Sequence, residues 1–284
     1  MEIIKKPSEI QRVIEQLRKE GRAIGAVLTM GALHEAHKSL IQRARRENDF
    51  LVVSIFINPT QFGPGEDYKT YPRTFEEDKK ICSDCSADLI FAPQSSDIYL
   101  AGHATTVNVE GGLTDYMCAK CRPGHYNGVA TVVAKLLKII KPHRAYFGQK
   151  DYQQFRVIER MVKDLNFETR LVMCPIIRED DGLAISSRNR YLTKKQRRQA
   201  PCIYKALKEA ALRLKSGDMP QSKEIYEYIL NCIPEANIDY ADIYDARKLI
   251  PVKEFKDDVV IAAAVQVGKA RLIDNVVVKK EDKK

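Results

Sequence analysis

Short apolar runs alternate with helix-length segments through the first 175 residues, and no other feature limits the possible folds as strongly. Apolar runs of strand length lie at 24–30, 51–57, 88–92, 144–147 and 169–174. Residues with helical spacing of apolar side chains lie between them, at 35–47, 75–84 and 151–165. Each helix returns the chain to the end of the sheet at which the previous strand began, so successive strands run parallel. The pattern predicts an α/β fold with a doubly wound parallel sheet.

Further elements are expected in this first part. Residues 7–20 have the apolar stripe of an amphipathic helix, with Ser8 as its cap, and Thr74 is placed to cap helix 75–84. Residues 105–109 alternate like a strand. The stretch 116–125 is expected to be irregular, and a well-buried helix follows it and ends near Ile140.

The pattern changes from about residue 178. Thr193 and Gln196 have the spacing of a capping box, which predicts a long helix as far as Lys215 that Pro201 bends. A second helix is expected at 222–232, and strand-like runs follow at 238–244, 259–267 and 271–278. We therefore expect a domain at 1–177, a smaller α+β domain at 178–284, and a hinge near 175–178.

Residues 29–37, with the sequence TMGALHEAH, connect the first buried run to the first helix of the sheet. Gly31 permits a tight turn, and the helix that follows offers unpaired N–H groups and a positive dipole end to a phosphate. His34 and His37 are three apart and share a face of that helix. A helical HExxH zinc motif needs two residues between Glu and the second His, but only Ala36 separates Glu35 from His37.

Polar segments follow the strands in several places. Ligands of a doubly wound sheet bind at the carboxyl ends of its strands. Four segments are expected together at that end: 29–37, 58–61, 148–154 and 185–188. The first three follow a predicted strand directly. The long loop at 58–73 contains three prolines and is expected to be a functional lid.

The segments at 148–154 and 185–188 indicate an anionic ligand. Lys150 lies where a helix begins and is placed to neutralise phosphate charge. Ser186, Ser187 and Arg188 offer two hydroxyls and a guanidinium in one short turn, which suits a triphosphate. Neither a GxGxxG sequence after the first strand nor a Walker A sequence is present, so the chain carries no marker of a dinucleotide or P-loop site.

Six motifs together resemble the pantothenate synthetases (pantoate–β-alanine ligases), a family of the nucleotidylyltransferase superfamily with a Rossmann-like sheet. The resemblance runs from about residue 20 to residue 198 and continues more loosely to the end. The motifs, in family order, are TMGALHEAH (29–37), FINPTQF (56–62), YPRT (71–74), RPGH (122–125), GQKDYQQ (148–154) and SSRN (186–189).

The resemblance implies that pantoate attacks the α-phosphate of ATP to give pantoyl adenylate and pyrophosphate, and that β-alanine then displaces AMP. It implies a catalytic set of His37 as proton donor with His34, Lys150 and Arg188. Gln61 and Gln154 would bind pantoate, and Gln61 would also bind β-alanine; Asn58, Arg122 and His125 would contribute nearby. The residues that would bind ATP are Met30, Gly31, Ala32, Leu33, His34, Glu35, Ala36, His37, Gly148, Gln149, Lys150, Asp151, Ile177, Ile185, Ser186, Ser187 and Arg188.

The resemblance also bears on ligands and partners. ATP would be a substrate accompanied by Mg²⁺, with Glu77 or Asp78 as a protein group that reaches the ion. No tightly bound organic cofactor is expected. The family resemblance implies a homodimer. No apolar run approaches a membrane span and residues 1–6 lack the apolar core of a signal peptide, so a cytoplasmic location without membrane contact is expected.

Two cysteine pairs offer a competing interpretation. Cys82/Cys85 and Cys118/Cys121 have the pair spacing of a structural zinc site. The predicted topology opposes it, because the first pair closes a helix that leads to the amino end of a strand, whereas the second lies just before a ligand-end segment. We therefore expect no protein-bound metal, and seven reduced thiols in place of a disulfide framework.

Two other functions are compatible with parts of the sequence. A formal net charge of +9 is compatible with nucleic-acid binding, but the densest basic clusters lack interleaved aromatic residues, and small anionic substrates account for the charge. Nucleotidyl transfer that releases a dinucleotide would leave Gln61 and Gln154 without an acid to bind. Nucleic acid is therefore not an expected partner.

Overall fold

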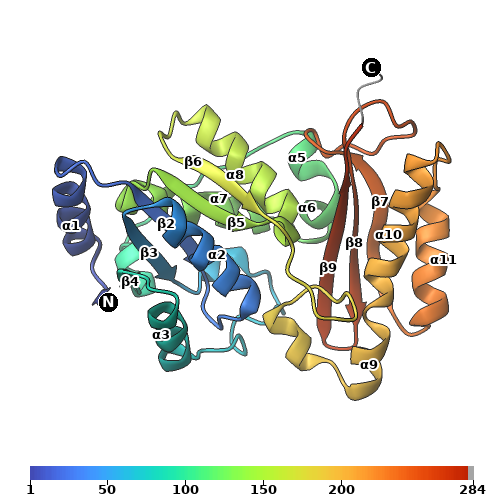
Figure 1. The fold of residues 1–284 in the computed structure, drawn as a ribbon, viewed down its shortest axis with the longest axis horizontal. Helices are drawn as coiled ribbons and strands as arrows, with labels where there is room; N and C mark the ends of the chain where they lie inside the picture. The colour runs from blue at the N-terminus through green and yellow to red at the C-terminus, as the bar shows by residue number, and fades with distance from the viewer. Residues whose placement is uncertain (281–284) are drawn as a thin grey trace. The chain divides into compact units, whose positions relative to one another are not determined.

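The computed structural model describes residues 1–280 and divides into two compact units (Figure 1). The first unit comprises Met1–Val109, Arg122–Gly148 and Val157–Pro175. The second comprises Glu110–Cys121, Gln149–Arg156 and the chain from Ile176 onward. Two segments that precede the predicted hinge thus belong to the second unit.

The first unit is built on a six-stranded sheet of order β1-β4-β3-β2-β5-β6, and every neighbouring pair is parallel. The predicted doubly wound parallel sheet is therefore confirmed. Its strands are β1 (Glu2–Ile4), β2 (Ile24–Thr29), β3 (Phe50–Ile55), β4 (Leu89–Phe91), β5 (Arg144–Gly148) and β6 (Arg170–Cys174). The central strands are buried on both faces, which explains why they read as continuous apolar runs.

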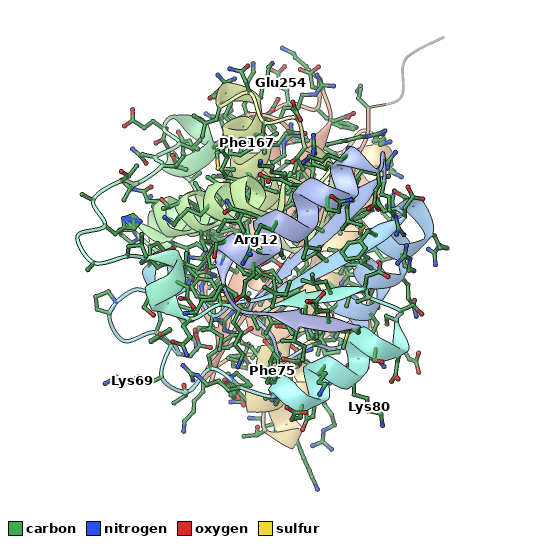
Figure 2. The ribbon with its side chains drawn as sticks, turned by 90° about the vertical axis from the view of Figure 1, so that its left-hand side faces the viewer. Arg12, Lys69, Phe75, Lys80, Phe167 and Glu254 are labelled. Atoms are coloured by element: carbon green, nitrogen blue, oxygen red, sulfur yellow. The ribbon has the colours of Figure 1, made fainter. Side chains whose placement is uncertain are left out.

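Helices flank this sheet (Figure 1). On one face, α2 (Glu35–Glu47) and α3 (Phe75–Asp84) pack Ile41, Ala44 and Cys82 against Val27, Leu51 and Ile90. The other helices of this unit are α1 (Pro7–Lys19), the short α4 (Ser95–Ile98) and the largely buried α7 (His125–Ile140). Helix α8 (Tyr152–Asp164) begins in the second unit and ends in the first. The charged side chains of Arg12 on α1 and Lys80 on α3 are exposed (Figure 2).

Two predictions for this unit were wrong, and one strand was missed. Helix α1 begins at Pro7 with Lys6 as its N-cap, so Ser8 lies inside the helix and does not cap it. Residues 105–109, all of them described, are not assigned to a strand. Strand β1 was not predicted, because its three residues are too short to show a period, and it pairs with β4 at the edge of the sheet.

The second unit is built on an antiparallel sheet of β7 (Asn237–Asp245), β8 (Val259–Val267) and β9 (Ala270–Val278). Helices α10 (Cys202–Lys215) and α11 (Ser222–Cys232) pack their apolar residues against it, with Leu207 and Ile229 fully buried. The predicted helices followed by a small antiparallel sheet are therefore confirmed.

Two local predictions for this unit need correction. The capping box at Thr193 is present, but the helix it opens, α9 (Lys194–Gln199), ends before Pro201, and α10 begins after it. Proline therefore divides the expected long helix in two. The stretch expected to be irregular contains α6 (Met117–Cys121), which follows the short α5 (Gly112–Asp115).

His143 gives the first unit a pH-dependent contact. Its Nδ1 accepts a hydrogen bond from the Ile24 amide at 2.9 Å, and its own amide donates to the Ile24 carbonyl at 2.8 Å, so the neutral ring joins the starts of β2 and β5. Although the residue as a whole is exposed, desolvation of the ring and the charges of Arg18 and Arg144 lower the pKa of His143.

The unfolded chain therefore binds this proton at a higher pH than the folded protein does. The stabilisation is present above the unfolded value of about 6.5 and is lost as the pH falls through the lowered pKa. We expect the Tm of the wild type to fall more between about pH 7.5 and pH 5.5 than that of His143→Asn, whose side-chain oxygen accepts the same bond without titrating. Equal falls in thermal melts of the two proteins would contradict this role.

Candidate functional site

The turn between β2 and α2 is strained and tightly held. Gly31 and Ala32 both have positive φ, at 81° and 51°, which a glycine adopts readily and an alanine rarely does. Helix α2 starts at Glu35 with His34 as its N-cap. The backbone N–H of His34 donates to Nδ1 of His37 at 3.3 Å, and the two rings stack with centroids 4.0 Å apart. Because Nδ1 accepts, the proton of a neutral His37 ring lies on Nε2.

Asp78 of α3 holds this turn from the side. Its carboxylate is 1% exposed and accepts the amide N–H groups of Ala32 at 3.0 Å and Leu33 at 2.8 Å. Burial raises the pKa of Asp78, while these backbone bonds oppose the rise. A Cβ at Gly31 would lie only 2.8 Å from Asp78 Oδ2, so glycine is required there. Both oxygens of Asp78 are engaged by the turn, and its contact with magnesium stays a prediction.

Replacing Asp78 with alanine is expected to destabilise the protein, because two buried N–H groups lose their acceptor. Each such loss costs about 1–3 kcal/mol, so we expect the free energy of unfolding in urea to fall by about 3 kcal/mol. Glu77→Ala, an exposed position on the same helix, serves as the control. A wild-type unfolding midpoint for Asp78→Ala would contradict the assigned role.

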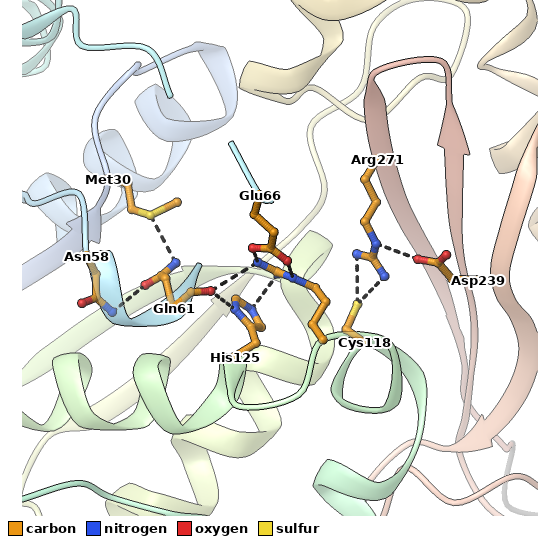
Figure 3. A network of polar contacts seen from close by, with 9 residues as sticks. Met30, Asn58, Gln61, Glu66, Cys118, His125, Asp239 and Arg271 are labelled. Carbon is orange, nitrogen blue, oxygen red and sulfur yellow. Dashed lines mark hydrogen bonds and ion pairs between the residues drawn. The ribbon is translucent and has the colours of Figure 1, made fainter. Parts of the chain in front are cut away.

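The segment after β3 positions Gln61. Asn58, which is 1% exposed, donates from Nδ2 to Gln61 Oε1 at 3.0 Å and to the Gly128 carbonyl at 3.1 Å. Gln61 in turn contacts the Met30 sulfur through Nε2 at 3.2 Å (Figure 3). The structure therefore brings together two predicted site residues, Met30 and Gln61, from the ends of neighbouring strands.

Gly128 makes this arrangement possible. It lies in α7, where a Cβ would be 2.3 Å from the Thr60 carbonyl oxygen and 2.7 Å from the Gln61 amide nitrogen. Only glycine allows the short helix Pro59–Gln61 to approach α7 so closely. Gly128 was not among the residues expected at the site, although a lone glycine inside an apolar helical pattern is a recognised signal of such packing.

In the second unit, Asn275 of β9 fixes the segment that carries Lys150. Asn275 is 3% exposed, and its Nδ2 donates to the carbonyls of Gln149 at 3.0 Å and Lys150 at 3.1 Å. Its Oδ1 accepts from Gln149 Nε2 at 3.2 Å. Asp151 is exposed and Gln154 half-buried. Sequence reasoning missed Asn275, which is separated from this segment by 125 residues.

The hairpin at 176–188 carries the remaining predicted nucleotide residues. The Ile185 amide donates to the Ile177 carbonyl at 3.0 Å, so these two predicted residues are neighbours. Arg178 closes the base of the hairpin with a bidentate ion pair to Asp274, at 2.6 and 2.9 Å. Ser186 caps the helical turn Ser187–Tyr191, in which Arg188 lies. Ser186 and Lys150 also line one small cavity of about 10 Å³, the size of a single water.

The predicted segments are thus grouped within each unit. Segments 29–37 and 58–61 lie at the ends of β2 and β3, and Gly148 is the last residue of β5. These three strands are adjacent in the sheet. The segment 185–188 belongs to the second unit, so its expected place beside the other segments stays a prediction.

The four cysteines of the two pairs lie on α3 and α6. Cys82 and Cys85 are buried in the first unit, whereas Cys118 and Cys121 belong to the second. Cys118 contacts the Arg271 guanidinium at 3.4 and 3.5 Å (Figure 3). Within residues 1–280, no three His, Cys, Asp or Glu side chains converge as metal ligands would.

Comparison with known proteins identifies the family. The family model of pantoate-beta-alanine ligase matches residues 2–277. The chain belongs to the pantoate–β-alanine ligase family. The resemblance seen in the sequence motifs is thereby confirmed, and the chain is a ligase.

Relatives within this family match along their whole length. Pantothenate synthetase of Thermodesulfovibrio yellowstonii is 49% identical over 280 residues, which cover 98% of this chain and 100% of the relative. The crystal structure of pantothenate synthetase from Thermus thermophilus superposes with a TM-score of 0.91 at 42% identity, covering 97% of this chain and 99% of that one.

A second structural relative was solved with ligands. Pantoate-beta-alanine ligase from Francisella tularensis, complexed with beta-gamma ATP and beta-alanine, matches with a TM-score of 0.83 at 35% identity, covering 98% of this chain and 97% of that one. Among residues 1–280 of the present chain, no helix combines the length and the apolar composition that a membrane span requires.

Proposed function

We propose that this protein condenses pantoate with β-alanine in an ATP-dependent reaction through a pantoyl-adenylate intermediate, releasing AMP and pyrophosphate. The observation that carries the proposal is the contact between Gln61 and Met30 at the carboxyl ends of adjacent strands, in a chain that matches pantoate–β-alanine ligases from end to end. The Francisella relative, complexed with a form of ATP and β-alanine, supports the nature of two substrates.

In the first step, a pantoate carboxylate oxygen forms a bond to the α-phosphorus as the bond to the β-phosphate oxygen breaks, and pyrophosphate leaves. Such a reaction depends on positioning and charge stabilisation more than on covalent work by the protein. We assign His37 as a proton donor through Nε2, since Nδ1 accepts the His34 N–H. His34, Lys150 and Arg188 supply further stabilisation of phosphate charge.

In the second step, the β-alanine amine attacks the acyl carbon, the bond to the phosphate oxygen breaks, and AMP leaves. Gln61 and Gln154 are proposed to bind pantoate through neutral amides, which suit an acid that loses its charge when it is activated. Gln61 is also proposed to contact β-alanine. Asn58, which is buried and bonded to the Gln61 side chain, holds that amide in one orientation.

The nucleotide is assigned to residues 30–37 and 148–151, Ile177 and residues 185–188. Magnesium enters with ATP. We further propose that residues 178–284 act as a lid domain to residues 1–177, and that the protein is a cytoplasmic homodimer. Protection of the 175–178 region from limited proteolysis when ATP is added would test the lid, and sedimentation velocity would test the dimer.

The decisive experiment measures AMP and pantothenate formed from ATP, pantoate and β-alanine. We expect AMP and pantothenate in equal amounts, and neither product when pantoate or β-alanine is omitted. AMP release without both substrates, or the absence of pantothenate, would overturn the proposal. A dinucleotide product would indicate nucleotidyl transfer in its place.

A further inference from the structure

Glu66 ties the middle of the loop at 58–73 to the body of the first unit. Its carboxylate accepts Nε and Nη2 of Arg122, both at 2.6 Å, a bidentate pair whose side chains are only 26% and 16% exposed (Figure 3). Burial disfavours ionisation of Glu66, but the hydrogen bonds and charge of Arg122 hold its pKa below the usual value. A paired, half-buried carboxylate of this kind fixes the guanidinium in one orientation.

Arg122 in turn determines which ring nitrogen of His125 accepts a hydrogen bond. An arginine only donates, so the 2.9 Å contact between Arg122 Nη1 and His125 Nε2 makes Nε2 the acceptor. The proton of the neutral ring is then on Nδ1, which lies 2.8 Å from the Gln61 carbonyl oxygen and donates to it. Arg122 Nη2 reaches the same oxygen at 3.4 Å. One directed series of bonds thus leads from Glu66 to the Gln61 peptide.

The Gln61 backbone is therefore restrained at both of its peptide groups. His125 and Arg122 bind its carbonyl, and Gly128 lies so close to its amide that a methyl group has no room between them. The side chain beyond that peptide is fixed separately by Asn58 and Met30. The position of that side chain also depends on the backbone from which it extends.

We propose that Glu66 is a positioning residue that acts through Arg122 and His125 to orient Gln61 for the acid substrate. The proposal rests on the function proposed above, in which Gln61 binds pantoate. Glu66 itself touches no substrate. Its carboxylate keeps Arg122 in the orientation that selects the His125 tautomer, and that tautomer supplies the donor to the Gln61 carbonyl.

The test compares Glu66→Gln with the wild type in pantothenate formation. Glu66→Gln keeps the size of the side chain and removes its charge. We expect KM for pantoate to rise about tenfold, with KM for ATP within about twofold of wild type, and Glu66→Asp to restore part of the difference. Unchanged kinetics, or an equal rise in both KM values, would overturn the proposal.

Arg73→Ala provides the matched control for the loop. Arg73 donates to the carbonyls of Tyr68 and Tyr71 in the same loop but has no bond to the Gln61 network. We expect this variant to leave KM for pantoate near the wild-type value. An increase equal to that of Glu66→Gln would show that loop order alone is responsible, and would overturn the proposal.

A double variant separates positioning from charge neutralisation and guards against misfolding. Glu66→Gln/Arg122→Met removes both charges, so no buried guanidinium is left unpaired. We expect its fold, measured by circular dichroism, to be retained and its KM for pantoate to stay raised, because His125 has lost the donor to Nε2. Recovery of the wild-type KM would overturn the proposal. If the wild type forms no pantothenate, the proposed function fails; if it does and the variants behave normally, this inference alone fails.

Discussion

Replacing His37 with alanine is expected to lower kcat for pantothenate formation by about 10²–10³-fold, the usual effect of losing a proton donor or a donor to developing charge. The reason is local: Nδ1 is engaged by the His34 amide, which leaves Nε2–H as the donor. Steady-state rates of AMP formation at saturating ATP measure the loss.

A matched variant separates chemistry from helix capping. His37 occupies the third position of α2 and accepts the N-cap amide, a place where glutamine caps equally well. We therefore expect His37→Gln to keep the wild-type Tm while kcat stays low, and Gln42→Ala, exposed on the same helix, to change neither. Normal turnover by His37→Gln would reduce His37 to a capping residue.

Replacing Lys150 with alanine is expected to lower kcat/KM for ATP by about 10²-fold or more, because the cation that we propose to neutralise phosphate charge is lost. The backbone at Lys150 is clamped by Asn275, so the segment should keep its conformation without the side chain. Initial rates over a range of ATP concentrations measure the effect.

Lys208→Ala is the control for this variant. It removes the same charge from an exposed position on α10 in the same unit. We expect wild-type kinetics from it, since surface charges at a distance are screened by salt. If Lys150→Ala matched Lys208→Ala, Lys150 would have no role at the phosphates.

The sheet was predictable because its central strands are buried on both faces and therefore consist mostly of apolar residues. Strand β1 was not predicted, because three residues at the edge of a sheet are too few to show a periodic pattern. Residues 105–109 have the alternation of a strand, but pairing depends on a neighbour elsewhere in the chain, and alternation alone does not supply one. Pro201 lies where a bend and a break have the same sequence pattern, because proline permits either a kinked helix or two separate ones.

The motifs predict residues that would touch substrate, whereas nothing in the sequence marks the residues that hold them in place. Asp78 acts on a turn 46 residues away, and Glu66 reaches Arg122 across 56. A carboxylate of this kind looks like any surface acid in the sequence. Its role exists only once the fold has brought its partner within hydrogen-bond distance.

Because β3, β2 and β5 are neighbours in the sheet, the distances between their ends are fixed. Neighbouring strands lie about 4.8 Å apart, so the ends of β3 and β5 are separated by about 10 Å, with β2 midway. That spacing is set by backbone hydrogen bonds, which all residues except proline make alike. Core substitutions that keep the sheet intact are therefore expected to leave the separation of the three strand ends unchanged.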